Sequence, residues 1–143
     1  MVDALSQAQR VLTSQGVLID VHPVIEPIMV EVVAGTEAIW AKQVDSFSAP
    51  DDVTAANAAV EDAVSQGSLV FETSARFLFD IYCDSAAELQ RYAEGRKLRG
   101  AEIPYEELED RQRELTAQGK APRLRCRRPW MLSAFRKRDF KAR

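Results

Sequence analysis

The stretch Gly16-Val17-Leu18-Ile19-Asp20-Val21-His22-Pro23 decides how the chain is interpreted, because a short apolar run that follows glycine and ends at His-Pro is typical of a buried strand. The run is rich in Val, Leu and Ile and too short for an ordinary helix, so we expect a strand covered on both faces. Pro23 lacks an amide hydrogen and favours an extended His22. The single histidine of the chain is therefore expected at the carboxyl end of this strand, which is where open α/β sheets bind ligands.

The composition is that of an ordinary globular domain. With 143 residues and 46% hydrophobic content, residues 1–143 can bury a sizeable core as a single domain, with 136–143 as a basic and mobile tail.

No apolar run approaches the roughly 20 residues that cross a bilayer, and the start of the chain does not resemble a signal peptide, so we expect a cytoplasmic protein without a membrane partner. Two cysteines, Cys83 and Cys126, lie in apolar surroundings and are expected to be buried thiols.

Hydrophobic periodicity and turn residues predict the order of elements. Apolar positions three and four apart indicate helices over 5–12, 53–64, 86–93 and 104–118, the second beginning near 48–52 and the third carrying a Ser85-x-x-Glu88 capping box. Short apolar runs and alternation indicate strands over 17–22, 28–33, 38–44, 69–82 and 123–132, although a short helix is the alternative for 38–44. This order predicts an α/β to α+β fold, with a mixed, largely antiparallel sheet and helices mainly on one face.

Arg10-Val11-Leu12, the turn Thr13-Ser14-Gln15-Gly16 and the apolar strand after it resemble the late part of a class I S-adenosylmethionine-dependent methyltransferase. In that family, a helix with an Arg-Val-Leu ending, a Lys-Pro-Gly-Gly-type turn and an apolar strand form the fifth strand unit. A helical region and an antiparallel hairpin then close the Rossmann-like sheet, and the strands over 69–82 and from Arg123 resemble that pair. The resemblance covers essentially the whole chain, as the carboxyl-terminal half of the family's domain.

The resemblance also implies what this chain does not supply. The family holds the nucleoside with a glycine-rich loop after its first strand and an acidic residue after its second, both in the part that precedes this segment. The six glycines here show no GxGxG spacing, and the turn keeps only Gly16 of the usual glycine pair. The resemblance therefore implies a chain that is inactive by itself, and that uses S-adenosylmethionine only if another chain or segment supplies the nucleoside site.

Candidate substrate-binding residues gather near the end of the first strand. His22 can act as a base or orient a substrate, and Asp20, Glu26 and Glu31 can supply carboxylates at the same edge. The alternatives are a hydrogen-bonded structural histidine and solvated or paired carboxylates, so the catalytic residues stay open. No Cys/His cluster indicates a metal site.

Two further patterns allow two interpretations each. The row Arg123, Arg125 and Arg127 can bind anions or nucleic acid, but we favour arginines that meet acidic residues such as Glu72 and Asp80 across an antiparallel pair. Phe71, Phe77 and Phe79 can line a small-molecule pocket, but alternating aromatics are more typical of a core.

Three classes of function follow from these patterns. The first is a methyltransferase-like half that completes a substrate site with a complementary chain. The second is a noncatalytic homodimer or small-ligand-binding protein, with 28–33 as an edge strand for self-association. The third, which we do not favour, is a weak nucleic-acid binder that uses the arginine row.

Overall fold

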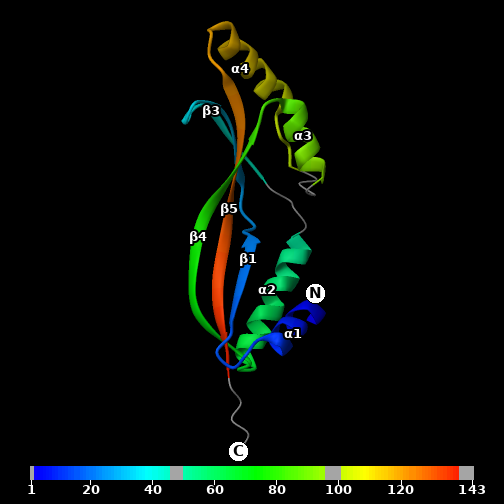
Figure 1. Ribbon diagram of the computed structural model, residues 1–143. Coiled ribbons are helices and arrows are strands. Elements are labelled where there is room, and N and C mark those ends of the chain that lie inside the picture. Colours follow the sequence, from blue (N-terminus) through cyan, green and yellow to red (C-terminus); the bar gives the residue numbers. More distant parts are fainter. Residues whose placement is uncertain (1, 46–49, 96–100, 139–143) are drawn as a thin grey trace, which may run out of the picture. The chain divides into compact units, whose positions relative to one another are not determined.

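The computed structural model describes residues 2–45, 50–95 and 101–138, and these form an α+β fold (Figure 1). Their elements are α1 (Val2–Val11), β1 (Val17–Pro23), β2 (Ile28–Ala34), β3 (Glu37–Val44), α2 (Pro50–Ser65), β4 (Leu69–Cys83), α3 (Ala86–Gly95), α4 (Tyr105–Ala117) and β5 (Pro122–Lys137). Within the described residues the strands form a five-stranded antiparallel sheet, so the α+β side of the predicted range is confirmed and the predicted mixed sheet is wrong.

The chain divides into two compact units, both of which include part of β4 and of β5. Unit 1 consists of Met1–Val24, Pro50–Phe77 and Trp130–Arg143, and unit 2 consists of Ile25–Ala49 and Leu78–Pro129. Local periodicity gave no sign of this division, because the two strands are continuous in sequence across it. A single cooperative domain over 1–143 stays a prediction.

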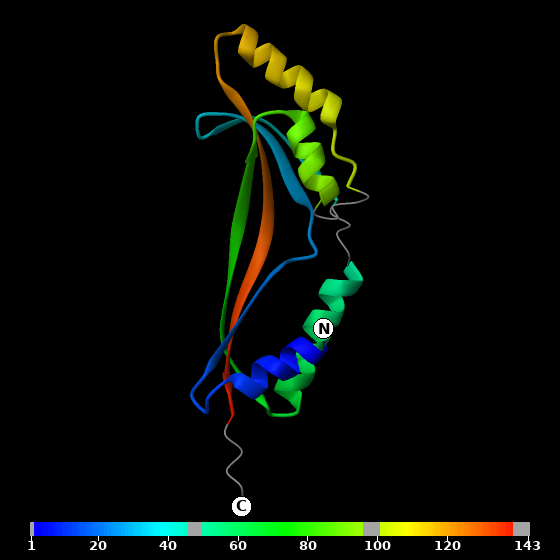
Figure 2. The ribbon, with the colours of Figure 1, turned by 45° about the vertical axis from the view of Figure 1, so that its right-hand side comes forward.

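Unit 1 is a three-stranded arrangement with two helices on one face. β5 lies between β1 and β4, and β1 runs antiparallel to it, from Val17 opposite Arg136 to Pro23 opposite Trp130 (Figure 1). The helices α1 and α2 lie side by side against this part of the sheet in both views (Figure 2). The core of the unit contains Ala63, Leu69 and Phe135, with Leu5, Leu18, Val60 and Val64 packed around them.

The expectation that β1 is covered on both faces is wrong for the described residues. Leu18, Asp20 and His22 are half-buried, and Leu18 packs into the core of unit 1. The alternate side chains are apolar but exposed: Val17 is 40%, Ile19 52% and Val21 46% accessible to solvent. Because successive side chains of a strand point to opposite faces, α1 and α2 cover one face of β1 and leave the other uncovered.

Gly16 allows the chain to pass closely from α1 into β1. Its backbone N–H donates to the Thr13 carbonyl oxygen at 2.9 Å, and a Cβ atom at this position would lie 2.8 Å from Leu12 Cδ2. The same Cβ atom would lie 3.0 Å from the Thr13 carbonyl oxygen and 3.1 Å from its nitrogen, so glycine relieves a close approach of the backbone here.

Unit 2 contains the β2–β3 hairpin, the adjoining parts of β4 and β5, and the helices α3 and α4. β2 pairs with β3 on one side and with Pro122 to Arg127 of β5 on the other, so the predicted edge strand over 28–33 is wrong and this strand is central. Gly35 takes a positive φ of 64° in the hairpin turn, and the preferred strand over 38–44 is confirmed. The core of the unit contains Ile28, Val30, Val32, Val44, Cys83, Ala86, Leu89, Ala93, Ile103, Leu108, Leu115, Leu124 and Cys126.

Most of the predicted helix boundaries are confirmed. Ser85 Oγ accepts from the Glu88 N–H at 3.2 Å, and a Glu88 carboxylate oxygen accepts from the Asp84 N–H at 2.7 Å, which satisfies two N–H groups at the start of α3. Gly67 and Gly119 follow α2 and α4 with positive φ. The α2 helix begins at Pro50, and residues 46–49 of its predicted start lie outside the described residues.

The predicted basic tail begins later than expected. Arg136 and Lys137 belong to β5, where Arg136 pairs with Glu72 of β4 and Lys137 donates to the Leu12 carbonyl oxygen at 2.8 Å. The expected end of the strand at residue 132 is therefore wrong, and residues 139–143 lie outside the described residues.

Candidate functional site

A cavity of about 400 Å³ lies in unit 1, between α2 and the helix-covered face of the sheet. Its volume is within the range of small-molecule sites, roughly 300 to 1,000 Å³. The lining combines apolar side chains with a few polar groups: Asp20, His22, Asn57, Val60, Glu61, Val64, Ser65, Phe71, Ser133 and Phe135.

The polar centre of the cavity is a carboxylate–imidazole pair on β1. Asp20 and His22 are two residues apart and therefore share a face of the strand. Asp20 Oδ2 lies 2.7 Å from His22 Nδ1, and the two side chains are 29% and 20% exposed. A proton on Nδ1 is donated to Asp20, which leaves Nε2 as the ring nitrogen that can meet a ligand.

The other walls come from α2, β4 and β5. The backbone register places Ser133 directly opposite Asp20, and Ser133 is buried. Phe135 forms an edge-to-face contact with Phe71, with ring centroids 5.8 Å apart. No local motif in the sequence marks Ser133, Asn57 or Glu61, because only the pairing of β1 with β5 and the position of α2 bring them to the cavity that His22 lines.

The aromatic residues of β4 do not form a core as predicted. Phe71 is 51%, Phe77 37% and Phe79 46% exposed. Phe71 lines the cavity, so the pocket interpretation holds for this residue. The core prediction is wrong because helices cover this strand near its ends, where Leu69 and Cys83 are buried, while 70–79 remain exposed.

Glu26 and Glu31 belong to unit 2 and are not brought to Asp20 and His22 within unit 1. Glu26 lies in the connection before β2 and is half-buried. Glu31 lies on β2, where it is buried against an arginine. The structure thus brings together two of the four candidate substrate-binding residues, Asp20 and His22.

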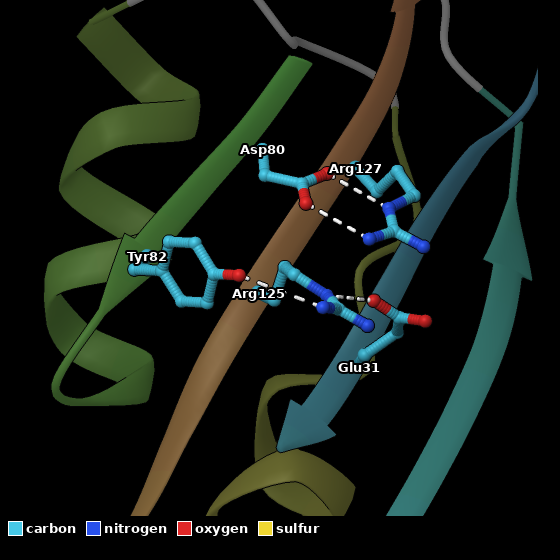
Figure 3. A network of polar contacts seen from close by, with 5 residues as sticks. All are labelled: Glu31, Asp80, Tyr82, Arg125 and Arg127. Carbon is cyan, nitrogen blue, oxygen red and sulfur yellow. Dashed lines mark hydrogen bonds and ion pairs between the residues drawn. The ribbon is translucent and has the colours of Figure 1, made fainter. Parts of the chain in front are cut away.

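The arginine row of β5 lies in unit 2, and Figure 3 shows two of its members, Arg125 and Arg127. Arg125 donates to Glu31, and both side chains are buried; Arg125 also donates to the Tyr82 hydroxyl at 3.5 Å. Arg127 makes two hydrogen bonds of 2.8 Å to the Asp80 carboxylate (Figure 3). Arg123 pairs with Asp84 at 2.8 Å and lies over the Tyr82 ring.

The favoured interpretation of this row was an exposed strand face with paired arginines; the pairing is confirmed, with Asp80 as a predicted partner, but the exposed face is wrong at Arg125, which is buried. The hydrogen bond from Arg127 holds the pKa of Asp80 below its ordinary value, and the hydrogen bond to Glu31 raises the pKa of Arg125. Each arginine of the row has its charge opposed within the chain, whereas Glu72 pairs with Arg136, beyond the row.

The described residues contain no group of three or more His, Cys, Asp or Glu side chains placed to hold a metal ion. Cys83 and Cys126 are buried and unbridged, as predicted, and burial raises the pKa of Cys126 to about 11. Among the helices of the described ranges, none has the length and apolar character needed to span a membrane.

Comparison of the chain with protein-family models, with curated proteins and with solved structures gave no match in any of the three.

Proposed function

We propose that the chain is the carboxyl-terminal half of a methyltransferase-like domain and supplies the substrate side of a site. The nucleoside side, with its glycine-rich loop, comes from another chain or segment. The observation that carries this proposal is the open edge of β1: in the described residues β1 pairs with β5 alone, and its uncovered face presents Val17, Ile19 and Val21.

An open edge of this kind is suited to a further strand. Edge strands that stay unpaired are usually protected by charges, bulges or proline, yet the exposed side chains in the middle of β1 are apolar. Covering apolar surface stabilises an assembly by about 25 cal/mol per Å². A neighbouring strand with its own helical layer would satisfy the backbone groups of β1 and cover this face.

The arrangement around β1 agrees with the resemblance read from the sequence. The α1 helix, the Gly16 turn and β1 follow one another as in the fifth strand unit of the methyltransferase family, and β5 runs antiparallel beside β1 with β4 on its other side. The cavity with Asp20 and His22 opens beside the same strand. This edge is therefore the one we assign to the substrate.

Calorimetric titration with S-adenosylmethionine tests the proposal. The chain alone should show no binding with a Kd below about 1 mM. Coexpression with the coding sequence directly upstream, which should contain a glycine-rich strand–loop–helix segment, should restore micromolar binding. Tight binding by the chain alone would contradict the proposal, and an upstream sequence without such a segment would leave a separate chain as the source of the nucleoside side.

A noncatalytic homodimer is the second candidate, and the same edge favours it. Two β1 strands related by a two-fold axis can pair antiparallel, which would satisfy their open backbone groups and place Val17, Ile19 and Val21 beside their own copies on one extended face. Sedimentation velocity separates the two candidates, because a monomer at micromolar concentration excludes the homodimer. The arginine row supports no separate candidate, since its charges are paired within the chain.

A further inference from the structure

We infer that the cavity of unit 1 binds an aromatic organic amine in its cationic form. This inference deepens the proposed function and rests on it, because it names the substrate class of the edge that carries His22. All the residues that form the cavity belong to unit 1, so ligand binding itself requires no second chain.

The apolar and aromatic side chains of the lining favour a ligand that contains an apolar ring. Val60 and Val64 of α2 form one wall, and the edge-to-face pair Phe71 and Phe135 forms another. Phe71 is 51% exposed although its ring lies against Phe135. A planar ligand would cover this exposed aromatic surface and would gain the favourable geometry of ring contacts.

The charged groups of the lining select the charge of the ligand. Asp20 and Glu61 contribute two carboxylates, and no lysine or arginine lines the cavity among the described residues. The sum is −2 with a neutral His22 and −1 with a protonated one, so the lining is negative in either state. A cation is favoured and an anion is disfavoured by the same Coulomb term, which is strongest where water is partly excluded.

The positions of these groups favour a ligand with an amine at one end. Asp20 and His22 lie on the sheet side, with Ser133 opposite Asp20 in register, whereas Glu61 lies on α2 and is exposed. An ammonium group carries only hydrogen-bond donors, which suit either carboxylate: Asp20 with the Ser133 hydroxyl oxygen on the sheet side, or Glu61 on α2. An aromatic cation also interacts favourably with the phenylalanine rings.

Three indole ligands that differ in charge test the inference with the isolated chain. These are tryptamine as the cation, tryptophol as the neutral analogue and indole-3-propionate as the anion, titrated by calorimetry without S-adenosylmethionine. Tryptamine should bind at least about tenfold more tightly than either analogue at low ionic strength, and added salt should reduce the difference.

A pair of adjacent charge-removing variants locates the effect. Glu61→Gln should weaken tryptamine binding by about three- to tenfold and leave tryptophol binding unchanged. Asp62→Asn is the matched control, since it removes the same charge from the next residue of α2, which lines a different cavity. It should leave the binding of both ligands unchanged, and Phe71→Ala should weaken both.

Binding of indole-3-propionate as tight as that of tryptamine would overturn the inference. So would equal effects of Glu61→Gln and Asp62→Asn, or no tryptamine binding at about 10 mM. Because these titrations contain no nucleoside, they separate the two proposals: amine binding with no nucleoside site in any coexpressed segment would refute the methyltransferase-like function alone.

Discussion

Glu31 and Arg125 are charged side chains that lie almost fully buried in unit 2, each about 6% exposed. Their attraction offsets the cost of removing both charges from water, and the Tyr82 hydroxyl satisfies a further donor of Arg125 (Figure 3). Loss of one partner would leave the other charge buried and uncompensated. The Asp80–Arg127 pair is less critical because its side chains are 26% and 31% exposed.

Replacing Glu31 by Gln should therefore lower the free energy of unfolding by about 3 kcal/mol at pH 7, measured by urea denaturation. The double variant Glu31→Leu with Arg125→Met should recover most of that loss, since two apolar side chains leave no buried charge. Asp80→Asn is the control for a more exposed pair and should cost at most about 1 kcal/mol. If Glu31→Gln lowered the free energy of unfolding by less than Asp80→Asn does, the buried charge of Arg125 would be solvated in another way.

Acid should reduce the loss in free energy of unfolding that Asp80→Asn causes. Arg127 lowers the pKa of Asp80 in the folded state below its unfolded value, so the pair contributes fully above an unfolded pKa of about 4. The contribution is lost as the pH falls through the lower, folded pKa. The wild-type chain and Asp80→Asn should accordingly converge in stability in strong acid.

At the scale of the element, β1 carries apolar side chains on both faces, and these lie in different environments. Leu18 packs into the core of unit 1 beneath the helices, whereas Ile19 is 52% exposed on the opposite face. Both residues have the same number of carbon atoms, so one truncation at each position compares the two faces directly. The hydrophobic contribution depends on the area removed from water.

Leu18→Ala should reduce the free energy of unfolding by about 2 kcal/mol, because it removes partly buried methyl groups and leaves space in the core. Ile19→Ala should cost less than about 0.5 kcal/mol when the chain is measured as a monomer. Urea denaturation at low micromolar concentration provides both values. Equal losses would mean that the face of Ile19 is already covered, either by a second copy or by another part of the chain.

At the scale of the whole molecule, the question is whether two compact units that share β4 and β5 unfold together. Each unit contains one of the two tryptophans, since Trp40 lies in unit 2 and Trp130 in unit 1. Continuous strands transmit unfolding, because loss of pairing in one half removes the neighbours that order the other half. One cooperative transition is therefore expected.

The variants Trp40→Phe and Trp130→Phe each leave one fluorescent reporter, in opposite units. In each variant, the urea midpoint measured by fluorescence should coincide with the urea midpoint measured by far-ultraviolet circular dichroism. If the two variants differ in urea midpoint, fluorescence and circular dichroism should show the same difference. Fluorescence and circular dichroism midpoints that separate within one variant would show that the units unfold independently.

Much of the secondary structure could be predicted from local signals in the sequence. Gly16 and the Ser85-x-x-Glu88 box mark a turn and a helix start by close approach of the backbone and short-range hydrogen bonds, and both were found where expected. The shared face of Asp20 and His22 also follows from the period of a strand. The paired arginines were predicted because opposite charges on antiparallel strands attract.

The sequence by itself therefore determined the order of elements and the shared strand face of Asp20 and His22, two of its four candidates, since local propensities and the period of a strand specify both. Only the tertiary structure decided that Ser133 and Glu61 reach the same cavity, that β2 is central, and that Phe71 is exposed. These features depend on which strands pair and which faces the helices cover. Such contacts join residues far apart in the chain, and no local propensity encodes them.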